Sequence, residues 1–203
     1  MIKKLSNKPV VDANIIQAIE ALKPFRGGLW DDNNHDINEF KNQLRDALIV
    51  IQNDKCAYCG LELNETGKRE IEHFAPKGGP VRPKHLEFMF TIDNLFLSCT
   101  LCNSPSKKGN NDIILVKKRK YQKCKFKILH PYYDNYDKHY QWVNEAHKVL
   151  ISYKTKKGKR TIKMFDLASP KQSMARAKLL KSELFSLPAN ALELLELVQK
   201  YRD

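Results

Sequence analysis

The stretch that decides the fold runs from Cys56 to Asn103 and holds four short motifs. In order they are Cys56-Ala57-Tyr58-Cys59, Glu72-His73-Phe74, Asp93-Asn94-Leu95 and Cys99-Thr100-Leu101-Cys102-Asn103. Each Cys-x-x-Cys pair places two sulfur ligands on one tight turn, and two such turns supply the four sulfurs that a tetrahedral zinc ion takes. We therefore predict a structural zinc site at Cys56, Cys59, Cys99 and Cys102.

The segment between the two cysteine pairs is long enough to hold a site of its own. It has 39 residues, from Gly60 to Ser98, which is more than a compact zinc ribbon needs. Working outward from it, the helical spacing of Phe40, Leu44 and Leu48 predicts a helix that ends near Gln52, with Asp36 and Glu39 as a capping box. Arg69–Phe74 is expected to be a strand, and 88–96 a turn into a second strand. A short helix is expected to start near Asn103.

The flanking segments predict further helices and strands. An N-terminal helix is expected after Asp12, because Ile15, Ile16, Ile19 and Leu22 share one helical face. Ile113–Val116 reads as a strand. Further elements are expected beyond residue 128: a hairpin formed by Trp142–Tyr153 and Arg160–Phe165 with its turn near Gly158, a helix from Ser169, and a last helix over Asn190–Tyr201. The predicted class is α+β.

Length and composition exclude some classes of protein. A chain of 203 residues that is 42% apolar and 29% charged can bury a core. No run of about 18 apolar residues is present, so no membrane span is expected, and the N-terminus lacks the apolar region of a signal peptide. We expect a cytoplasmic protein, in which thiols stay reduced and paired cysteines favour metal over disulfides.

The net charge of +13 is concentrated in two segments. Residues 107–127 carry nine Lys or Arg against one acid, and residues 154–163 carry six and no acid. Positive charge gathered in this way is typical of a surface that binds a polyanion such as nucleic acid. Lys107 and Lys108, which follow Asn103 closely, are expected to contact the phosphate backbone.

The residue types between the cysteine pairs suit phosphodiester hydrolysis. The reaction needs a base that activates water and a cation that neutralises charge on the phosphate. His73 suits the first task because its pKa lies near neutrality. A carboxylate and an amide oxygen suit a hard divalent ion such as Mg²⁺ or Mn²⁺, and Glu72 and Asn103 offer these groups. We also expected the free N–H groups of a helix starting at Asn103 to favour phosphate.

The four motifs resemble, in order and spacing, the HNH endonucleases with a ββα-metal core; the resemblance covers residues 38–110. It implies that His73 is the general base, that Asn94 orients the site, and that Glu72 and Asn103 hold the catalytic metal. Members of that family often carry Asp or a second His where this chain has Glu72 and Asn103. The chain is also similar to HNH nucleases of bacterial anti-phage systems, and most to the nuclease subunit of Septu-type defence. That resemblance implies an ATPase partner of the ABC/SMC-like class.

We expect residues 1–35 to form an N-terminal arm and helix, residues 36–127 the HNH core with its zinc site and basic run, and residues 128–203 an extension whose helices could dock on a partner. The leading hypothesis is a metal-dependent endonuclease that acts on DNA. A zinc-stabilised binding module without catalysis, or a subunit that serves an ATPase partner, remains an alternative. Glu72 argues against pure binding, since an acid in a phosphate-facing cleft repels nucleic acid unless a cation is present.

Overall fold

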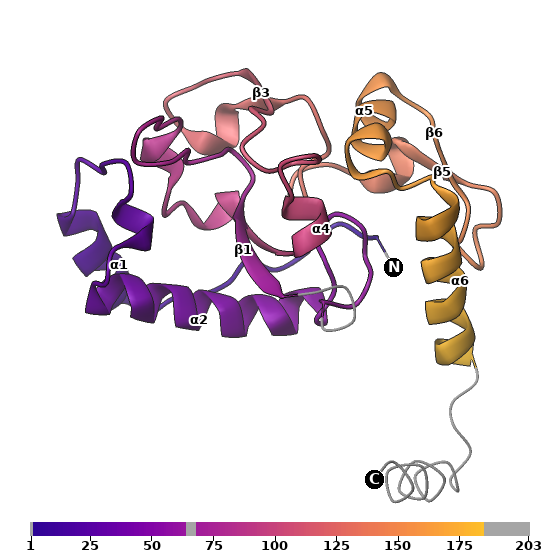
Figure 1. The fold of residues 1–203 in the computed structure, drawn as a ribbon, viewed down its shortest axis with the longest axis horizontal. Coiled ribbons are helices and arrows are strands. Elements are labelled where there is room, and N and C mark those ends of the chain that lie inside the picture. Colours follow the sequence, from indigo (N-terminus) through magenta and orange to yellow (C-terminus); the bar gives the residue numbers. More distant parts are fainter. Residues whose placement is uncertain (1, 64–67, 185–203) are drawn as a thin grey trace, which may run out of the picture.

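Helix α2 (His35–Gln52) runs along one side of the molecule and leads into the first cysteine pair (Figure 1). The computed structural model describes residues 2–63 and 68–184. Helix α1 (Ala13–Ala21) precedes α2 and packs on it. The buried residues of α2 recur at helical spacing and form one apolar face, as predicted; they are Ile37, Phe40, Leu44 and Leu48.

The start of α2 differs from the prediction. The N-cap is Asn34, whose side-chain oxygen accepts a hydrogen bond from the amide of Ile37 at 3.0 Å. Asp36 lies inside the first turn instead, where its charge suits the helix dipole. The predicted capping box of Asp36 and Glu39 was therefore wrong.

A two-stranded antiparallel sheet follows the first cysteine pair, and its second strand and the turn of helix after it carry the second pair. Strand β1 (Arg69–His73) pairs with β2 (Leu95–Cys99), with Arg69 opposite Cys99 and His73 opposite Leu95. Helix α4 (Thr100–Asn103) follows β2 without a linker. The order strand, loop, strand, short helix is the one that the sequence predicts.

Gln52, the last residue of α2, joins the helix to this sheet. Its side-chain amide donates to the carbonyl of Leu97 at 2.9 Å, and its side-chain oxygen accepts from the amide of Leu97 at 2.8 Å. The amide of Ala57, in the first cysteine turn, also donates to the carbonyl of Leu97. α2, the cysteine turn and β2 are thus fixed to one another through backbone groups.

The rest of the chain wraps around this centre. Strand β3 (Ile114–Val116) pairs with β4 (Lys125–Phe126), and β5 (Tyr140–Trp142) pairs with β6 (Ile151–Tyr153). Helices α5 (Lys156–Phe165) and α6 (Pro170–Leu184) follow and lie at one end of the molecule (Figure 1). The short 3₁₀ helices are η1 (Leu29–Asp31), η2 (Leu86–Phe88), η3 (Ile92–Asn94), η4 (Tyr121–Lys123) and η5 (Tyr136–Lys138).

The predicted C-terminal hairpin is wrong in both halves, because Trp142–Tyr153 is not one strand but holds the last residue of β5, a connection and β6. Arg160–Phe165 belongs to α5, and the partner of β5 is β6. Thr155 caps α5 by accepting from the amide of Gly158 at 3.1 Å, so Gly158 lies in a helix and not in a turn. The helix from Ser169 is confirmed as α6, whereas the predicted helix over Asn190–Tyr201 lies outside the described residues.

One apolar core joins all of these segments and confirms the α+β class. Its buried members run from Ile2 in the N-terminal arm to Leu167 after α5. Two contacts illustrate the long range: the ring of Tyr58 stacks on Phe165 at 4.2 Å, and the amide of Leu5 donates to the carbonyl of Pro131. Within the described part of the chain, no helix has the length and apolarity to cross a bilayer.

Candidate active site

The four cysteines predicted to bind metal come together. Their sulfur atoms all lie within 4.8 Å of one another, and the sulfurs of Cys59 and Cys99 are 4.0 Å apart. Zn–S bonds of about 2.3 Å in a tetrahedron place sulfurs about 3.8 Å apart, so the donor set fits a zinc ion. All four side chains are buried, which is typical of a closed structural site. The cluster could therefore hold a metal such as zinc.

The sheet brings the predicted catalytic residues to one cleft. The cleft has a volume of about 870 Å³, and His73, Glu72 and Asn103 all line it. Glu72 and His73 are neighbours on β1, so their side chains start on opposite faces of the strand. His73 is the last residue of β1 and, although almost fully buried, it lines the same cleft as Glu72.

His73 is held in a single orientation. Its Nε2 lies 3.0 Å from the carbonyl oxygen of Met89, and the ring packs edge-on against Trp30 at 4.5 Å. A carbonyl oxygen only accepts hydrogen bonds, so Nε2 carries the proton and the lone pair of the neutral ring lies on Nδ1. Burial, and next the positive charge of Lys77, lower the pKa of His73 to about 3. The imidazole is therefore neutral near pH 7, and its low pKa makes it a weaker proton acceptor than an exposed histidine.

Asn94 fixes the end of the strand that carries His73. It is fully buried; its side-chain oxygen accepts from the amide of Ala75 at 2.6 Å, and its amide donates to the carbonyls of Ala75 and Phe88. Its own carbonyl accepts from the amide of Phe74 at 2.8 Å. These bonds position the segment that follows His73, and Asn94 does not line the cleft.

Glu72 forms a buried ion pair with Lys108. The ammonium of Lys108 lies 2.9 Å from Glu72 Oε1 and also donates to the carbonyls of His73 and Gly109. Burial raises the pKa of Glu72, and the charge of Lys108 opposes that rise. Lys108 has no exposed surface, so it does not lie where the predicted phosphate contact would need it.

Asn103 lies at the last residue of α4, not at the start of a helix as predicted. Asn103 is therefore not beside the free N–H groups of a helix start, which were expected to bind a phosphate. Its amide donates to Glu70 Oε2 at 2.8 Å, and Thr100 donates to the other oxygen of Glu70. Lys107, the second predicted phosphate contact, instead donates to the carbonyl of Phe165 at 3.1 Å and lies 3.6 Å from Asp166.

Sequence reasoning missed several residues of the cleft, and two of them, Glu70 and Trp30, contact the predicted site residues. Glu70 stands two positions before Glu72 on the same strand, so the period of two could have placed both on one face. Trp30 lies in η1, far from the motifs in sequence, and no local pattern predicts its contact with His73. With Glu70 included, two carboxylates and the Asn103 amide line the cleft, a set of oxygen donors that suits a hard divalent cation.

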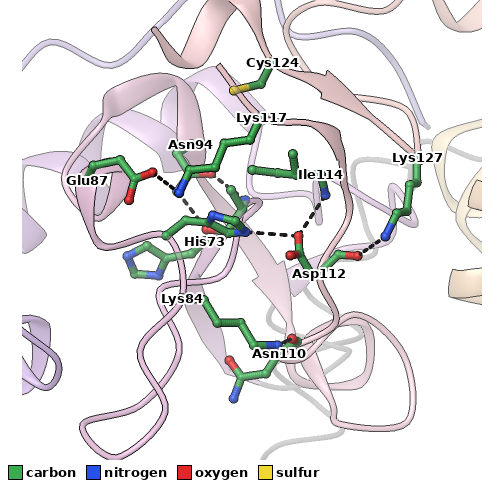
Figure 2. A network of polar contacts seen from close by, with 12 residues as sticks. His73, Lys84, Glu87, Asn94, Asn110, Asp112, Ile114, Lys117, Cys124 and Lys127 are labelled. Atoms are coloured by element: carbon green, nitrogen blue, oxygen red, sulfur yellow. Dashed lines mark hydrogen bonds and ion pairs between the residues drawn. The ribbon is translucent and has the colours of Figure 1, made fainter. Parts of the chain in front are cut away.

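Two loops beside the cleft are tied to each other. Figure 2 shows Lys84 in contact with the carbonyl of Asn110, and Asp112 accepting from the amide of Ile114. His85 Nε2 lies 3.1 Å from Asp112 Oδ1, and Lys117 pairs with Glu87 at 2.5 Å. The loop before η2 and the loop before β3 are thereby joined across the end of the cleft.

The fold and the cleft define a class: a ββα unit with a four-cysteine cluster and a histidine at the end of its first strand, as the resemblance to HNH endonucleases implies. Comparison with known proteins agrees with that class. The chain is similar to the Septu protein PtuB of Bacillus mycoides (strain KBAB4), at 28% identity over 153 residues, 68% of this chain and 51% of that protein. It is similar to the Septu protein PtuB of Bacillus thuringiensis, at 30% identity over 128 residues, 63% of this chain and 42% of that protein.

A third relative is a retron Vc95 putative HNH endonuclease of Vibrio cholerae serotype O1 biovar El Tor. It is 24% identical over 183 residues, which cover 85% of this chain and 80% of that protein. This chain spans about half the length of the Septu relatives or less. No family model matches the chain, and no solved structure was found to be similar. The resemblance to HNH nucleases of Septu type, predicted from the motifs, is confirmed by these relatives.

Proposed function

We propose that this chain is a metal-dependent HNH endonuclease that hydrolyses phosphodiester bonds of nucleic acid, with DNA as the expected substrate. The observation that carries the proposal is the state of His73. Its Nε2 is engaged by the Met89 carbonyl, which leaves the Nδ1 lone pair available, and it lines one cleft with Glu72 and Asn103. An oriented imidazole beside oxygen donors is the arrangement that activation of water at a phosphate needs.

In the proposed reaction His73 Nδ1 accepts a proton from the attacking water. The water oxygen bonds to phosphorus while the bond to the 3′ oxygen breaks, leaving 5′-phosphate and 3′-hydroxyl ends. Asn94 keeps the His73 segment in place through its bonds to Ala75 and Phe88. Trp30 covers one side of the imidazole and limits its rotation.

Glu72, Glu70 and Asn103 are the residues that would hold the divalent cation, Mg²⁺ or Mn²⁺, on the cleft wall. Such a cation supplies charge neutralisation at the phosphate and at the departing oxygen. Since Lys108 already neutralises Glu72, we propose that Lys108 supports the carboxylate in place of contacting the substrate backbone.

We propose a place in a bacterial anti-phage system of Septu type, with an ATPase of the ABC/SMC-like class as partner. Two relatives carry the Septu name and a third is named as a retron putative HNH endonuclease, whereas the ATPase partner rests on the resemblance of the motifs alone. Co-expression with an ATPase of that class, followed by co-purification, would test the partner separately from the chemistry.

Plasmid nicking tests the activity. The parent protein should nick supercoiled DNA with Mg²⁺ or Mn²⁺, and His73→Ala should lower the rate by about 10²–10⁴-fold, as loss of a general base does. His147→Ala, at an exposed histidine outside the cleft, is the matched control and should cut like the parent. Equal cutting by a folded His73→Ala protein would overturn the assignment of the base.

A further inference from the structure

The cleft contains two basic side chains, Lys41 and Arg45, that form no ion pair with any carboxylate of the described residues. Lys41 and Arg45, both on α2, line it together with Arg69 and Lys77. Arg69 forms a two-point contact with Asp54, and Lys77 pairs with Asp31 at 3.0 Å. Of the ion pairs formed within residues 2–63 and 68–184, none involves Lys41 or Arg45. Their contacts are neutral: Lys41 lies 5.3 Å from the Trp30 ring centre, and Arg45 donates to Asn42.

The positions of Lys41 and Arg45 make this charge unfavourable in isolation. They stand four residues apart on one helix, so their side chains lie on the same face, about 6 Å apart along the axis. Like charges at this spacing destabilise a helix. The pKa of Lys41 is lowered, and partial burial is the largest cause. The charge of Asp31 opposes this change, whereas the positive charges of Arg45 and Lys77 add to it. An anion in the cleft would relieve this repulsion.

The other basic residues expected to meet the substrate are engaged elsewhere. Lys108 is buried against Glu72, and Lys107 is bound to Phe165 and Asp166. α2 runs beneath β1, the strand that carries His73, while α4 with Asn103 lies beside that strand (Figure 1). A chain of phosphates that passes over His73 would thus meet Lys41 and Arg45 on the α2 side.

We propose that Lys41 and Arg45 form the phosphate-binding wall of the cleft and hold the sugar–phosphate backbone of a nucleic acid beside His73. The inference rests on the proposed function for the direction of the backbone. It places the phosphate contacts on α2 and not on the basic run after Cys102. Trp30, which contacts both Lys41 and His73, links the wall to the base.

Salt-dependent binding tests the proposal in a His73→Ala background, so that the probe is not cut. A fluorescein-labelled duplex DNA, and single-stranded DNA and RNA of the same length, are titrated by anisotropy at several salt concentrations. Lys41→Gln/Arg45→Gln should raise Kd by roughly tenfold and reduce the slope of log K against log salt by about 2 for the duplex, since each lost phosphate contact removes close to one unit. The preferred probe identifies the strand type.

Two control variants make the result specific. Lys171→Gln/Lys178→Gln removes the same charge from exposed positions of α6 and should leave Kd and slope near the parent values. Lys41→Arg/Arg45→Lys keeps the charge and should bind like the parent, and a melting curve for each variant shows that it is folded. If both charge-removing pairs weaken binding equally, or neither does, the proposed wall is wrong.

The same proteins with an intact His73 separate this inference from the proposed function. If the parent nicks DNA and the Lys41/Arg45 variant binds and cuts as well, the nuclease stands and the wall is overturned. If the parent cuts no probe but its binding depends on Lys41 and Arg45, the wall stands as a nucleic-acid site and the nuclease is overturned.

Discussion

Lys108 shows that a lysine inside a basic run can belong to the interior. From its position five residues after Asn103 it was expected at the surface, yet its ammonium is buried against Glu72 and two carbonyls. A sequence shows the charge of such a residue but not the carboxylate that folding brings to it. The placement of Lys108 therefore depends on β1, which is distant in sequence.

Removal of one partner should reveal the strength of this pair. Lys108→Met leaves Glu72 buried without its cation and should lower the free energy of unfolding by about 3–5 kcal/mol, as measured by urea denaturation. Lys118→Met, at an exposed position of the same run, should change it by less than about 0.5 kcal/mol. In Glu72→Gln/Lys108→Met the loss should be smaller than the sum of the single losses; simple additivity would argue against the pair.

His73 should make stability depend on pH. Its pKa is about 3 when folded and 6.5 as the ordinary value, so between these values the unfolded chain binds a proton that the folded chain does not. The free energy of unfolding should therefore be highest above pH 6.5 and fall as the pH is lowered towards 3. His130, another buried histidine with a lowered pKa, contributes in the same direction.

Urea denaturation between pH 7 and pH 4 measures this effect. A His73→Asn variant should lose less stability than the parent over that range, because the carboxylates and His130 contribute equally to both proteins and cancel in the difference. Parallel curves for the two proteins would mean that the folded His73 takes up a proton as readily as the unfolded one.

At the scale of elements, the sequence predicts what depends on local pattern. The apolar spacing of α2, the strand over 69–74 and the helix after Ser169 were all predicted and are confirmed. Arg160–Phe165 was expected to be a strand joined to Trp142–Tyr153 by a turn near Gly158, but it lies in α5. The helix is capped by Thr155 and packs at Gly158 against the carbonyl of His139, a contact that the pattern within Arg160–Phe165 does not show.

Gly158 offers a test of that packing. A Cβ at this position would lie 2.3 Å from the carbonyl oxygen of His139, so the helix can approach only because the residue is glycine. In an exposed helix Gly→Ala stabilises by about 1 kcal/mol, but here Gly158→Ala should lower the melting temperature. Lys156→Ala, at an exposed position in the same helix, should leave it nearly unchanged. A rise in melting temperature for Gly158→Ala would show that α5 does not pack on His139.

The candidate site was predictable where residues sit in motifs. The motifs named Glu72, His73, Asn94 and Asn103, and the structure places Glu72, His73 and Asn103 on one cleft while Asn94 fixes the segment after His73. Glu70, Trp30, Lys41 and Arg45 were not found, since they reach the cleft from a strand face, a loop and a preceding helix. Their positions are set by tertiary packing, which spacing along the chain does not encode.

At the scale of the whole molecule, the cysteine cluster joins the end of α2 to β2 and α4. The four sulfurs come from the turn after α2, from the end of β2 and from α4. A metal ion bound only by the folded chain adds its binding free energy to stability. The arrangement of the cleft should therefore depend on that ion.

Removal of the metal tests this dependence. Purified protein should contain one zinc ion per chain by elemental analysis, and Cys59→Ser should lose this ion. The free energy of unfolding of the variant should fall by more than about 4 kcal/mol, which corresponds to a fall of about 10 °C in melting temperature. Cys124→Ser, at the buried cysteine outside the cluster, should keep its zinc. A metal-free Cys59→Ser protein with the melting temperature of the parent would show that the cluster has no structural role.

The contact of Gln52 with Leu97 also has a consequence for the outer edge of β2. An open sheet edge offers unpaired backbone groups to any passing chain, and such edges seed aggregation. At Leu97 the amide side chain of Gln52 and the amide of Ala57 take the places that a third strand would fill. A glutamine at the end of a helix thus occupies the backbone groups of β2 at Leu97, where a strand of another molecule would otherwise pair.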